Sequence, residues 1–248
     1  SPGSMVLDTI EQRYSGQPAT QLTELRERLR AMTGTLTILT HDNPDPDALG
    51  AALGLRAIAE RFDVPAEICY FGEISHQENR AFVNLLDVNL KRLEEDDEVE
   101  SDSIALVDHS RPGVNDQLPP DTPIDIVIDH HPAPTLPEGA FLDVRSEVGA
   151  TSTLLVDYLE GYEIDVPTDV ANGLLYGIRV DTRDFGRETT AVDFEAAAKL
   201  LSKADLDVLE RIETPSLSPY TLETIGRAIE HRQVDDAILT SCVGQIQA

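Results

Sequence analysis

Short apolar runs alternate with longer stretches of helical periodicity along most of the chain. The short runs predict strands at Thr35–Thr40, Ala66–Phe71, Ser103–Val107 and Ile124–Ile128. The longer stretches predict helices at Thr20–Met32, Ala48–Phe62, Gln77–Leu86, Gly149–Tyr158 and Val166–Val180. Strands that alternate with helices form parallel sheets. The pattern therefore predicts an α/β fold with a doubly wound, mostly parallel sheet and helices on both faces.

Two connecting segments and the end of the chain depart from this alternation. The proline-rich segment Arg111–Asp125 and the charged segment Glu94–Asp102 both predict loops. Beyond Ser202, two helical stretches and a single strand are predicted at Asp205–Ile212, Pro219–Arg232 and Asp236–Val243. A lone strand at this place indicates the start of a second domain that is largely missing from this chain.

The pattern divides the chain into four expected regions. Residues 1–4 resemble the remnant of an expression tag, with Met5 as the natural start, and residues 5–34 form a helical lead-in. Residues 35–202 form the main α/β domain. Residues 203–248 form a helical linker and the beginning of a truncated C-terminal domain.

Composition bounds the class of protein and its compartment. Hydrophobic residues make up 41% of the 248 residues, which is typical of a globular protein with a proper core. No apolar run reaches the length of a membrane span, and no signal peptide is visible, so we expect no membrane partner. Cys69 and Cys242 lie in apolar, strand-like runs. Two buried thiols indicate a reducing cytoplasm instead of a disulfide framework or a zinc site.

The net charge of −27 changes the expected partners. The chain has 46 acidic residues against 19 basic ones. Such a surface is typical of a salt-accumulating cytoplasm, where screening removes the self-repulsion; the alternative is a moderately acidic protein with a solvated charged face. The charge argues against a broad basic groove for duplex DNA. It is compatible with a small anionic substrate held by bound metal ions.

Four short clusters carry the candidate chemistry. They are His41-Asp42-Asn43-Pro44-Asp45-Pro46-Asp47, Asp108-His109, Asp129-His130-His131 and Asp181-Thr182. Each follows a predicted strand or buried helix, and an open α/β sheet places its chemistry just beyond the carboxyl ends of its strands. Carboxylates and imidazoles without thiolates favour manganese, magnesium or a similar divalent ion. The alternative for each aspartate is a turn or a helix cap, and Asp47 in particular is a candidate N-cap for the following helix.

The segments HDNPDPDALGA, VDHS, DHHP and GIRVDTRDF resemble the four motifs of the DHH phosphoesterase superfamily. The resemblance covers Thr35–Phe185, so residues 35–202 would form a DHH-type N-terminal domain. Within the superfamily the chain is most similar to the oligoribonuclease and phosphoadenosine-phosphatase branch and to related archaeal proteins. Together with the acidic composition, this indicates a halophilic archaeon as the source.

The resemblance implies two bound divalent ions, manganese first and magnesium or cobalt as alternatives. One ion would be bound by His41, Asp45 and Asp108. The second would be bound by Asp47, Asp108, His130 and Asp181, which makes Asp108 the bridge. His131 would contact the substrate phosphate or act as an acid or electrophile, and Asp129 would orient a histidine. His109 would support the site or face solvent, with a role as a metal ligand as the alternative.

Substrate contacts are less well defined by the motifs. Arg179, Arg183 and Arg187 flank the fourth motif and are candidates for bidentate phosphate contacts, with an ordinary surface role as the alternative. Segment 149–152 opens a helix and offers amides and hydroxyls to an anion, with helix capping as the alternative. The family's nucleases carry a C-terminal associated domain with a glycine-rich, histidine-ending motif. That motif is not found here: either the chain is truncated near Ala248 or the protein works without the motif, so the resemblance does not define substrate affinity and specificity.

The resemblance implies a metal-dependent phosphohydrolase in which two metals activate a water. The expected substrates are short oligonucleotides or small nucleotides, with cleavage of phosphodiester or phosphomonoester bonds. One alternative is a family II-like inorganic pyrophosphatase or exopolyphosphatase, although Phe185 after Asp181-Thr182 is more similar to the nuclease side. The other alternative is a non-catalytic nucleotide sensor. A homodimer is left open.

Overall fold

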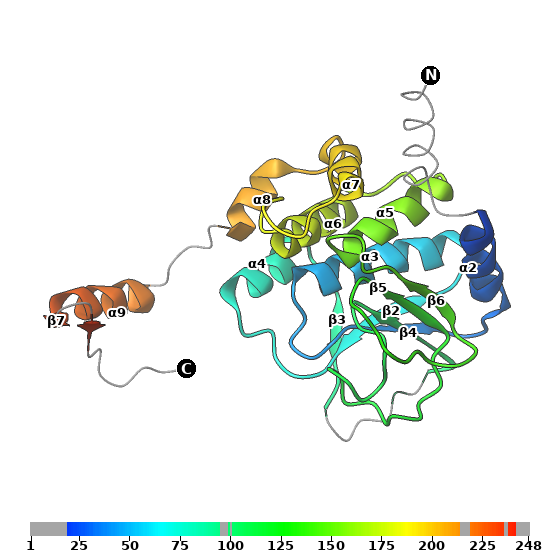
Figure 1. Cartoon of the computed structure of the whole chain (residues 1–248), viewed down its shortest axis with the longest axis horizontal. Helices are drawn as coiled ribbons and strands as arrows, with labels where there is room; N and C mark the ends of the chain where they lie inside the picture. Colours follow the sequence, from blue (N-terminus) through cyan, green and yellow to red (C-terminus); the bar gives the residue numbers. More distant parts are fainter. Residues whose placement is uncertain (1–18, 95–98, 100, 214–218, 236–237, 242–248) are drawn as a thin grey trace. The chain divides into compact units, whose positions relative to one another are not determined.

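The computed structural model describes residues 19–94, 99, 101–213, 219–235 and 238–241 (Figure 1). The chain divides into two compact units, Ser1–Glu213 and Thr214–Ala248. Residues 1–4, Cys242 and most of the charged segment 94–102 lie outside the described residues, as does part of the strand expected at 236–243.

The first unit is built on a six-stranded sheet in the order β3-β2-β1-β4-β5-β6. Every neighbouring pair is parallel, which confirms the expected α/β class. The strands are β1 (Leu36–Leu39), β2 (Ala66–Tyr70), β3 (Leu90–Arg92), β4 (Ser103–Val107), β5 (Ile126–Asp129) and β6 (Phe141–Val144). The chain runs outward from β1 to β3 and then from β4 to β6 in the other direction. The strand order therefore reverses between β1 and β4, where open α/β sheets bind their ligands.

The helices cover one face of this sheet (Figure 1). They are α2 (Ala19–Ala31), α3 (Pro46–Arg61), α4 (Gln77–Leu85), α5 (Thr151–Gly161), α6 (Thr168–Asp181), α7 (Ala191–Leu201) and α8 (Leu206–Glu213). Because successive strand residues point to opposite faces, Leu36 and Ile38 join the core beneath the helices, whereas Leu39 joins a smaller core on the other face.

Loops cover that second face, where helices had been expected as well. Leu118 and Ile124, from the connection between β4 and β5, pack there against Leu106 and Val127. The connection contains four prolines within 111–125, and proline both lacks an N–H and clashes inside a helix, so this segment cannot form one. The sheet is doubly wound in its strand order, with helices on one face only among the described residues.

Two edge strands and one helix were not anticipated from the sequence. Edge strand β3 is short and largely exposed, and β6 alternates buried with half-buried positions, so neither forms a continuous apolar run. Helix α7 begins with a capping box in which Thr190 and Asp193 bond each other's backbone amides. The sequence carries that signal, with aspartate three residues after the threonine.

Helix α3 lies between the sheet and α6, and it approaches α6 through glycines. A Cβ atom added to Gly50 would lie 2.5 Å from the Gly173 carbonyl oxygen, and one added to Gly177 would lie 2.9 Å from the Cα of Asp47. The small residues at the start of α3 therefore serve a helix–helix contact as well as contact with the sheet. This contact brings the start of α3 beside α6.

The second unit contains α9 (Pro219–Glu230), β7 (Gln233–Asp235) and β8 (Ile238–Thr240), and the two strands pair antiparallel. The helix expected at 219–232 is confirmed, whereas the single strand expected after it is a hairpin.

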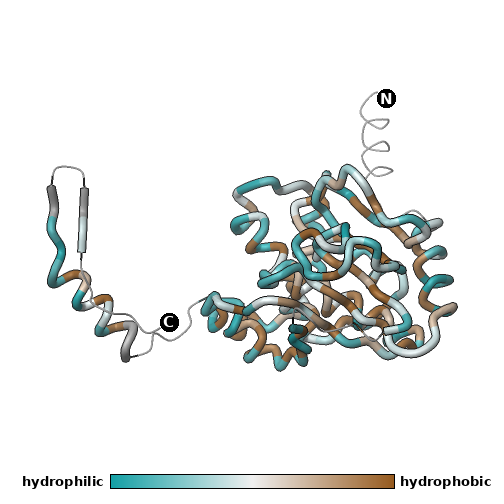
Figure 2. Tube along the Cα trace, turned by 90° about the horizontal axis from the view of Figure 1, so that it is seen from below, coloured by the Kyte–Doolittle hydropathy of each residue, from teal (hydrophilic) through white to brown (hydrophobic). Residues whose placement is uncertain are grey.

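Hydropathy along the Cα trace shows apolar segments concentrated inside the first unit (Figure 2). No helix among the described residues is both long and apolar enough to cross a membrane. Cys69 is buried and free, as expected.

Candidate metal centre

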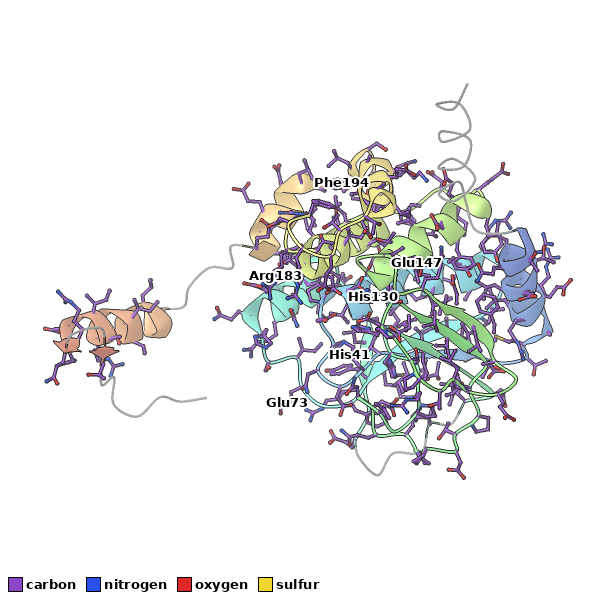
Figure 3. All side chains as sticks on the ribbon, viewed as in Figure 1. His41, Glu73, His130, Glu147, Arg183 and Phe194 are labelled. Carbon is purple, nitrogen blue, oxygen red and sulfur yellow. The ribbon has the colours of Figure 1, made fainter. Side chains whose placement is uncertain are left out.

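The four acidic-histidine clusters meet beyond the carboxyl ends of the central strands. Leu39 of β1 pairs with Leu106 of β4, so the residues that follow these strands emerge together. His41 Nε2 lies 3.5 Å from Asp108 Oδ2, and His130 Nε2 lies 3.7 Å from Asp108 Oδ1. Figure 3 labels His41 and His130 in this central region. The sheet has therefore gathered residues that are 89 positions apart in the sequence, between 41 and 130.

Two groups of possible metal ligands are present. Within each group, one nitrogen or oxygen atom per residue lies within 4.8 Å of the others. The groups are His41, Asp45 and Asp108, and Asp47, His130 and Asp181. A third such group joins Asp108 to His130 and His131. The first group is the ligand set that the resemblance implies for one ion, and the second contains three of the four residues that it implies for the other ion. The third group includes His131, for which the resemblance implies a phosphate contact and no metal contact.

Asp108 lies between the two groups. Its Oδ2 faces His41 and its Oδ1 faces His130, and the residue is 3% exposed. Its φ of 62° is in the left-handed region, where aspartate is one of the few tolerated residues. The turn after β4 thus directs this carboxylate back across the strand ends instead of leaving it in a surface loop.

The first motif holds its two candidate ligand aspartates, Asp45 and Asp47, in different ways. Asp45 is the N-cap of α3, and its Oδ1 accepts hydrogen bonds of 3.0 Å from both the Asp47 and Ala48 amides. The prediction that Asp47 caps this helix is wrong, because Pro46 occupies the first helical position, where its fixed φ fits. Asp47 is fully buried instead and accepts hydrogen bonds from the Thr151 and Ser152 amides at 2.6 and 2.8 Å. It therefore caps α5.

The electrostatics of this centre favour a bound cation. Burial raises the pKa of Asp47, and the neighbouring carboxylates of Asp108 and Asp181 raise it further. Burial lowers the pKa of His41, but the carboxylates of Asp108 and Asp45 outweigh it and raise that pKa to about 11. A cation placed between such carboxylates would remove their mutual repulsion.

His130 supplies a more specific sign of a ligand. Its Nε2 is buried without a hydrogen-bond partner among the described residues, although it lies 3.2 Å from Asp181 Oδ2. Burial lowers the pKa of His130, and Asp181, Asp47 and Asp108 overcome this and raise it to about 10. A buried polar atom without a hydrogen bond is rare, and a metal ion would satisfy it. Carboxylate and imidazole donors without thiolates suit manganese, magnesium or cobalt.

The orientation of His131 is fixed by hydrogen bonds to Asp129. Asp129 Oδ1 accepts hydrogen bonds from the His131 amide at 3.0 Å and from its Nδ1 at 2.9 Å, while Ser110 donates to Oδ2. Asp129 therefore orients a histidine, as expected, and that histidine is His131. The hydrogen bond to Asp129 raises the pKa of the His131 imidazole, which is half exposed. With Nδ1 engaged, Nε2 is left available for a substrate.

His109 is a buried support for the adjoining loop. Its Nδ1 donates to the Val107 carbonyl at 2.9 Å, and its Nε2 lies 3.0 Å from Asp116 Oδ2. Asp116 Oδ1 also accepts the Gly113 and Leu118 amides. Because both ring nitrogens are engaged within the protein, His109 does not face solvent and does not bind a metal.

The ligand groups open into a cleft of about 260 Å³. The residues that line it include His41, Asp45, Asp108, His131 and Arg111. Arg111 donates a 3.2 Å hydrogen bond to Thr135 Oγ1. The sequence prediction did not include Arg111, although it lies three residues beyond Asp108 in the same motif loop.

The arginines that were predicted to contact substrate do not line this cleft. Arg179 forms ion pairs with Asp184 and Glu213. Arg179 and Arg183 line a separate depression. Arg187 pairs with the neighbouring Glu188. The charge of Arg179 is thus already compensated by carboxylates, one of which comes from α8.

The amides at the start of α5 are also occupied. The Gly149 amide donates to the Asp193 carboxylate at 3.0 Å, and the next helical amides bond Asp47 as described above. The structure therefore supports the capping alternative for segment 149–152 over an anion site. Asp193, which is fully buried, was not singled out by the sequence analysis.

Residues 35–178 match the DHH family, N-terminal domain. The chain belongs to the DHH family. This match covers the first three motifs and most of α6.

Two relatives are similar to this chain over most of its length. The chain is 43% identical over 213 residues to an uncharacterized protein of Methanocaldococcus jannaschii, covering 85% of this chain and 44% of that protein. It is 29% identical to a "probable manganese-dependent inorganic pyrophosphatase" of Lactobacillus johnsonii, covering 70% of this chain and 56% of that protein. The chain therefore spans about half the length of these curated relatives.

A solved structure has the same fold. The crystal structure of an exopolyphosphatase-related protein from Bacteroides fragilis superposes with a TM-score of 0.66 at 20% identity, covering 88% of this chain and 67% of that one. The DHH superfamily and its parallel α/β domain are confirmed. The oligoribonuclease branch and the halophilic source remain predictions.

Proposed function

We propose that this chain is a divalent-metal-dependent phosphohydrolase that uses two ions, with manganese as the metal. The position of Asp108 carries the proposal, because its two oxygens face the two ligand groups. Two ions sharing one carboxylate, about 3.5–4 Å apart, form the arrangement used by many hydrolases of phosphate esters. The manganese dependence printed in the name of the Lactobacillus johnsonii relative supports the choice of metal.

Different side chains of the protein would bind the two ions and contact the substrate. His41, Asp45 and Asp108 would hold one ion, and Asp47, Asp108, His130 and Asp181 the other. When bound, the ions would supply an activated water and neutralise phosphate charge. His131, kept in place by Asp129, would donate from Nε2 to a phosphate oxygen or to the leaving group. Arg111 would contact a phosphate oxygen further along the cleft.

The cleft supports short oligonucleotides or small nucleotides as substrates. Beyond the ligands it is lined by apolar groups from Val114, Pro132, Ala133 and Pro134, which can contact a nucleoside. Among the described residues that line it, Arg111 alone is an arginine or lysine. A fully charged inorganic phosphate chain would be expected to need more cationic partners than this, whereas a diester carries one charge per phosphate.

Inorganic pyrophosphate is the second candidate substrate. The observation in its favour is the printed name of the Lactobacillus johnsonii relative. A nucleotide sensor without turnover is a third possibility from the sequence, and the presence of every expected ligand in the two groups argues against it.

One set of assays separates these functions. Turnover would be measured with Mn²⁺ on a dinucleotide, a long single-stranded RNA, duplex DNA and pyrophosphate in the same buffer. We expect the dinucleotide to be cleaved fastest and the duplex hardly at all, because a surface with a net charge of −27 repels long polyanions. Faster hydrolysis of pyrophosphate would support the second candidate. Binding of nucleotide without any turnover would support a sensor.

A further inference from the structure

Thr151 connects three of the four motifs. It is the first residue of α5 and is fully buried. Its amide donates to Asp47 Oδ2 at 2.6 Å, and its Oγ1 donates to Asp108 Oδ1 at 2.7 Å. The same Oγ1 accepts a 3.2 Å hydrogen bond from the His130 amide. These partners lie 104, 43 and 21 residues away along the chain.

The hydroxyl of Thr151 does not act as an ordinary helix cap. A capping hydroxyl accepts from an amide of its own helix, and α5 has no such side-chain cap. Asp47 bonds the first amides of α5 instead. The Thr151 hydroxyl is therefore directed away from its helix, to the ends of β4 and β5.

The hydrogen bond from Thr151 to Asp108 is made to Oδ1 of the carboxylate, on the side of the second ligand group. Asp108 Oδ1 is the oxygen that faces His130, at 3.7 Å from its Nε2. A hydroxyl bonded to this oxygen restricts rotation of the carboxylate and keeps Oδ2 directed at His41. Only a side chain that both donates and accepts can bond Asp108 and the His130 backbone at once.

We propose that Thr151 is a positioning residue that holds the Asp108 carboxylate in its bridging orientation and thereby sets the affinity for the ion bound by Asp47, Asp108, His130 and Asp181. The inference rests on the proposed two-ion function. Groups that orient metal ligands change metal affinity by roughly 10–100-fold when they are removed. We therefore expect removal of the Thr151 hydroxyl to weaken the binding of one of the two ions by a factor of roughly 10–100.

Three variants test this role. Thr151→Val removes the hydroxyl at nearly constant volume, and Thr151→Ser keeps it. Thr153→Val is the matched control, because Thr153 is buried in the same helix but donates to Asp193 and touches no ligand. Mn²⁺ binding to metal-free protein would be measured by titration calorimetry, and the coupling between bound ions by electron paramagnetic resonance. Far-UV circular dichroism without metal would establish that each variant is folded.

We expect Thr151→Val to bind one Mn²⁺ roughly 10–100-fold more weakly and to lose the signal of coupled ions. Thr151→Ser should stay close to the wild type, and so should Thr153→Val. Wild-type affinity in Thr151→Val, an equal loss in Thr153→Val, or no rescue by serine would each overturn the inference. If Thr151→Val does not fold, Thr151→Ala is measured in its place with the same expectation. If the wild type itself binds fewer than two ions, the proposed two-ion function fails instead.

Discussion

At the scale of single residues, the candidate ligand aspartates Asp45 and Asp47 also cap helices. Asp45 caps α3 with one oxygen, and Asp47 caps α5 with both. A carboxylate has about four lone pairs, so these hydrogen bonds leave positions for a cation. The choice between a cap and a ligand, which the sequence left open for these residues, is therefore not exclusive. The sequence could not say which helix each aspartate caps, because Asp47 bonds a helix more than 100 residues away.

The assigned roles predict different results for two substitutions. Asp108→Ala should abolish activity and lower the Mn²⁺ content, because Asp108 faces both ligand groups. His131→Ala should keep most of its metal and lose roughly 10²–10⁴-fold in turnover, the usual contribution of an acid or base. Elemental analysis and steady-state kinetics on both variants would measure this. Loss of both ions from His131→Ala, or wild-type turnover in Asp108→Ala, would contradict the assignment.

The pKa values of the histidines predict how metal binding depends on pH. With pKa values of about 11 for His41 and about 10 for His130, both imidazoles are protonated at pH 7 in the metal-free protein. A coordinating imidazole must be neutral, so Mn²⁺ binding releases protons, and its affinity should rise as the pH rises from 6 to 8. Calorimetry in buffers of different ionisation enthalpy measures the proton count. A binding heat that does not depend on the buffer would show that this assignment is wrong.

At the scale of elements, the central strands could be predicted and the edges could not. Strands β1, β4 and β5 are buried on both faces and read as continuous apolar runs, whereas β3 is mostly exposed. The pairing of Arg179 with Glu213 also escaped prediction, because it depends on how α8 packs beside α6. Long-range side-chain partners of this kind leave no local pattern in the sequence.

The glycine contact between α3 and α6 predicts a linked loss of stability and metal affinity. In Gly177→Ala, the new Cβ would lie 2.6 Å from Ser152 Oγ and 2.9 Å from Asp47 Cα, so Asp47 must shift. Overpacking of this kind costs about 1–3 kcal/mol of unfolding free energy. Urea denaturation and Mn²⁺ titration of the variant would measure both effects.

Gly161→Ala, in the same unit, is the matched control. Its new Cβ would approach the methyl groups of the Leu22 side chain, which can rotate away. We expect a smaller loss of stability there and unchanged Mn²⁺ affinity. Equal Mn²⁺ affinity in Gly177→Ala and the wild type would show that the helix contact does not position the site.

At the scale of the whole molecule, the net charge of −27 lowers the stability of the folded state through self-repulsion. At most 19 of the 46 acidic residues can pair one-to-one with a lysine or arginine. The remaining negative charges repel one another in the folded state, and the groups of possible ligands bring four aspartates and three histidines together: Asp45, Asp47, Asp108, Asp181, His41, His130 and His131. General screening and specific cation binding should therefore both stabilise the fold, by separate routes.

Thermal melts can separate the two routes. Raising KCl from about 0.1 M to about 1 M shortens the Debye length from about 10 Å to about 3 Å, so the melting temperature of the wild type should rise. Mn²⁺ at fixed salt should raise it further, since a ligand that binds the native state stabilises it by mass action. Asp108→Ala should keep the response to KCl and lose most of the response to Mn²⁺, because the substitution removes one charge, whereas both proposed ions would share that carboxylate. A melting temperature that is constant across the KCl series would mean that the acidic surface is already fully solvated. The stability of the fold would then not depend on salt.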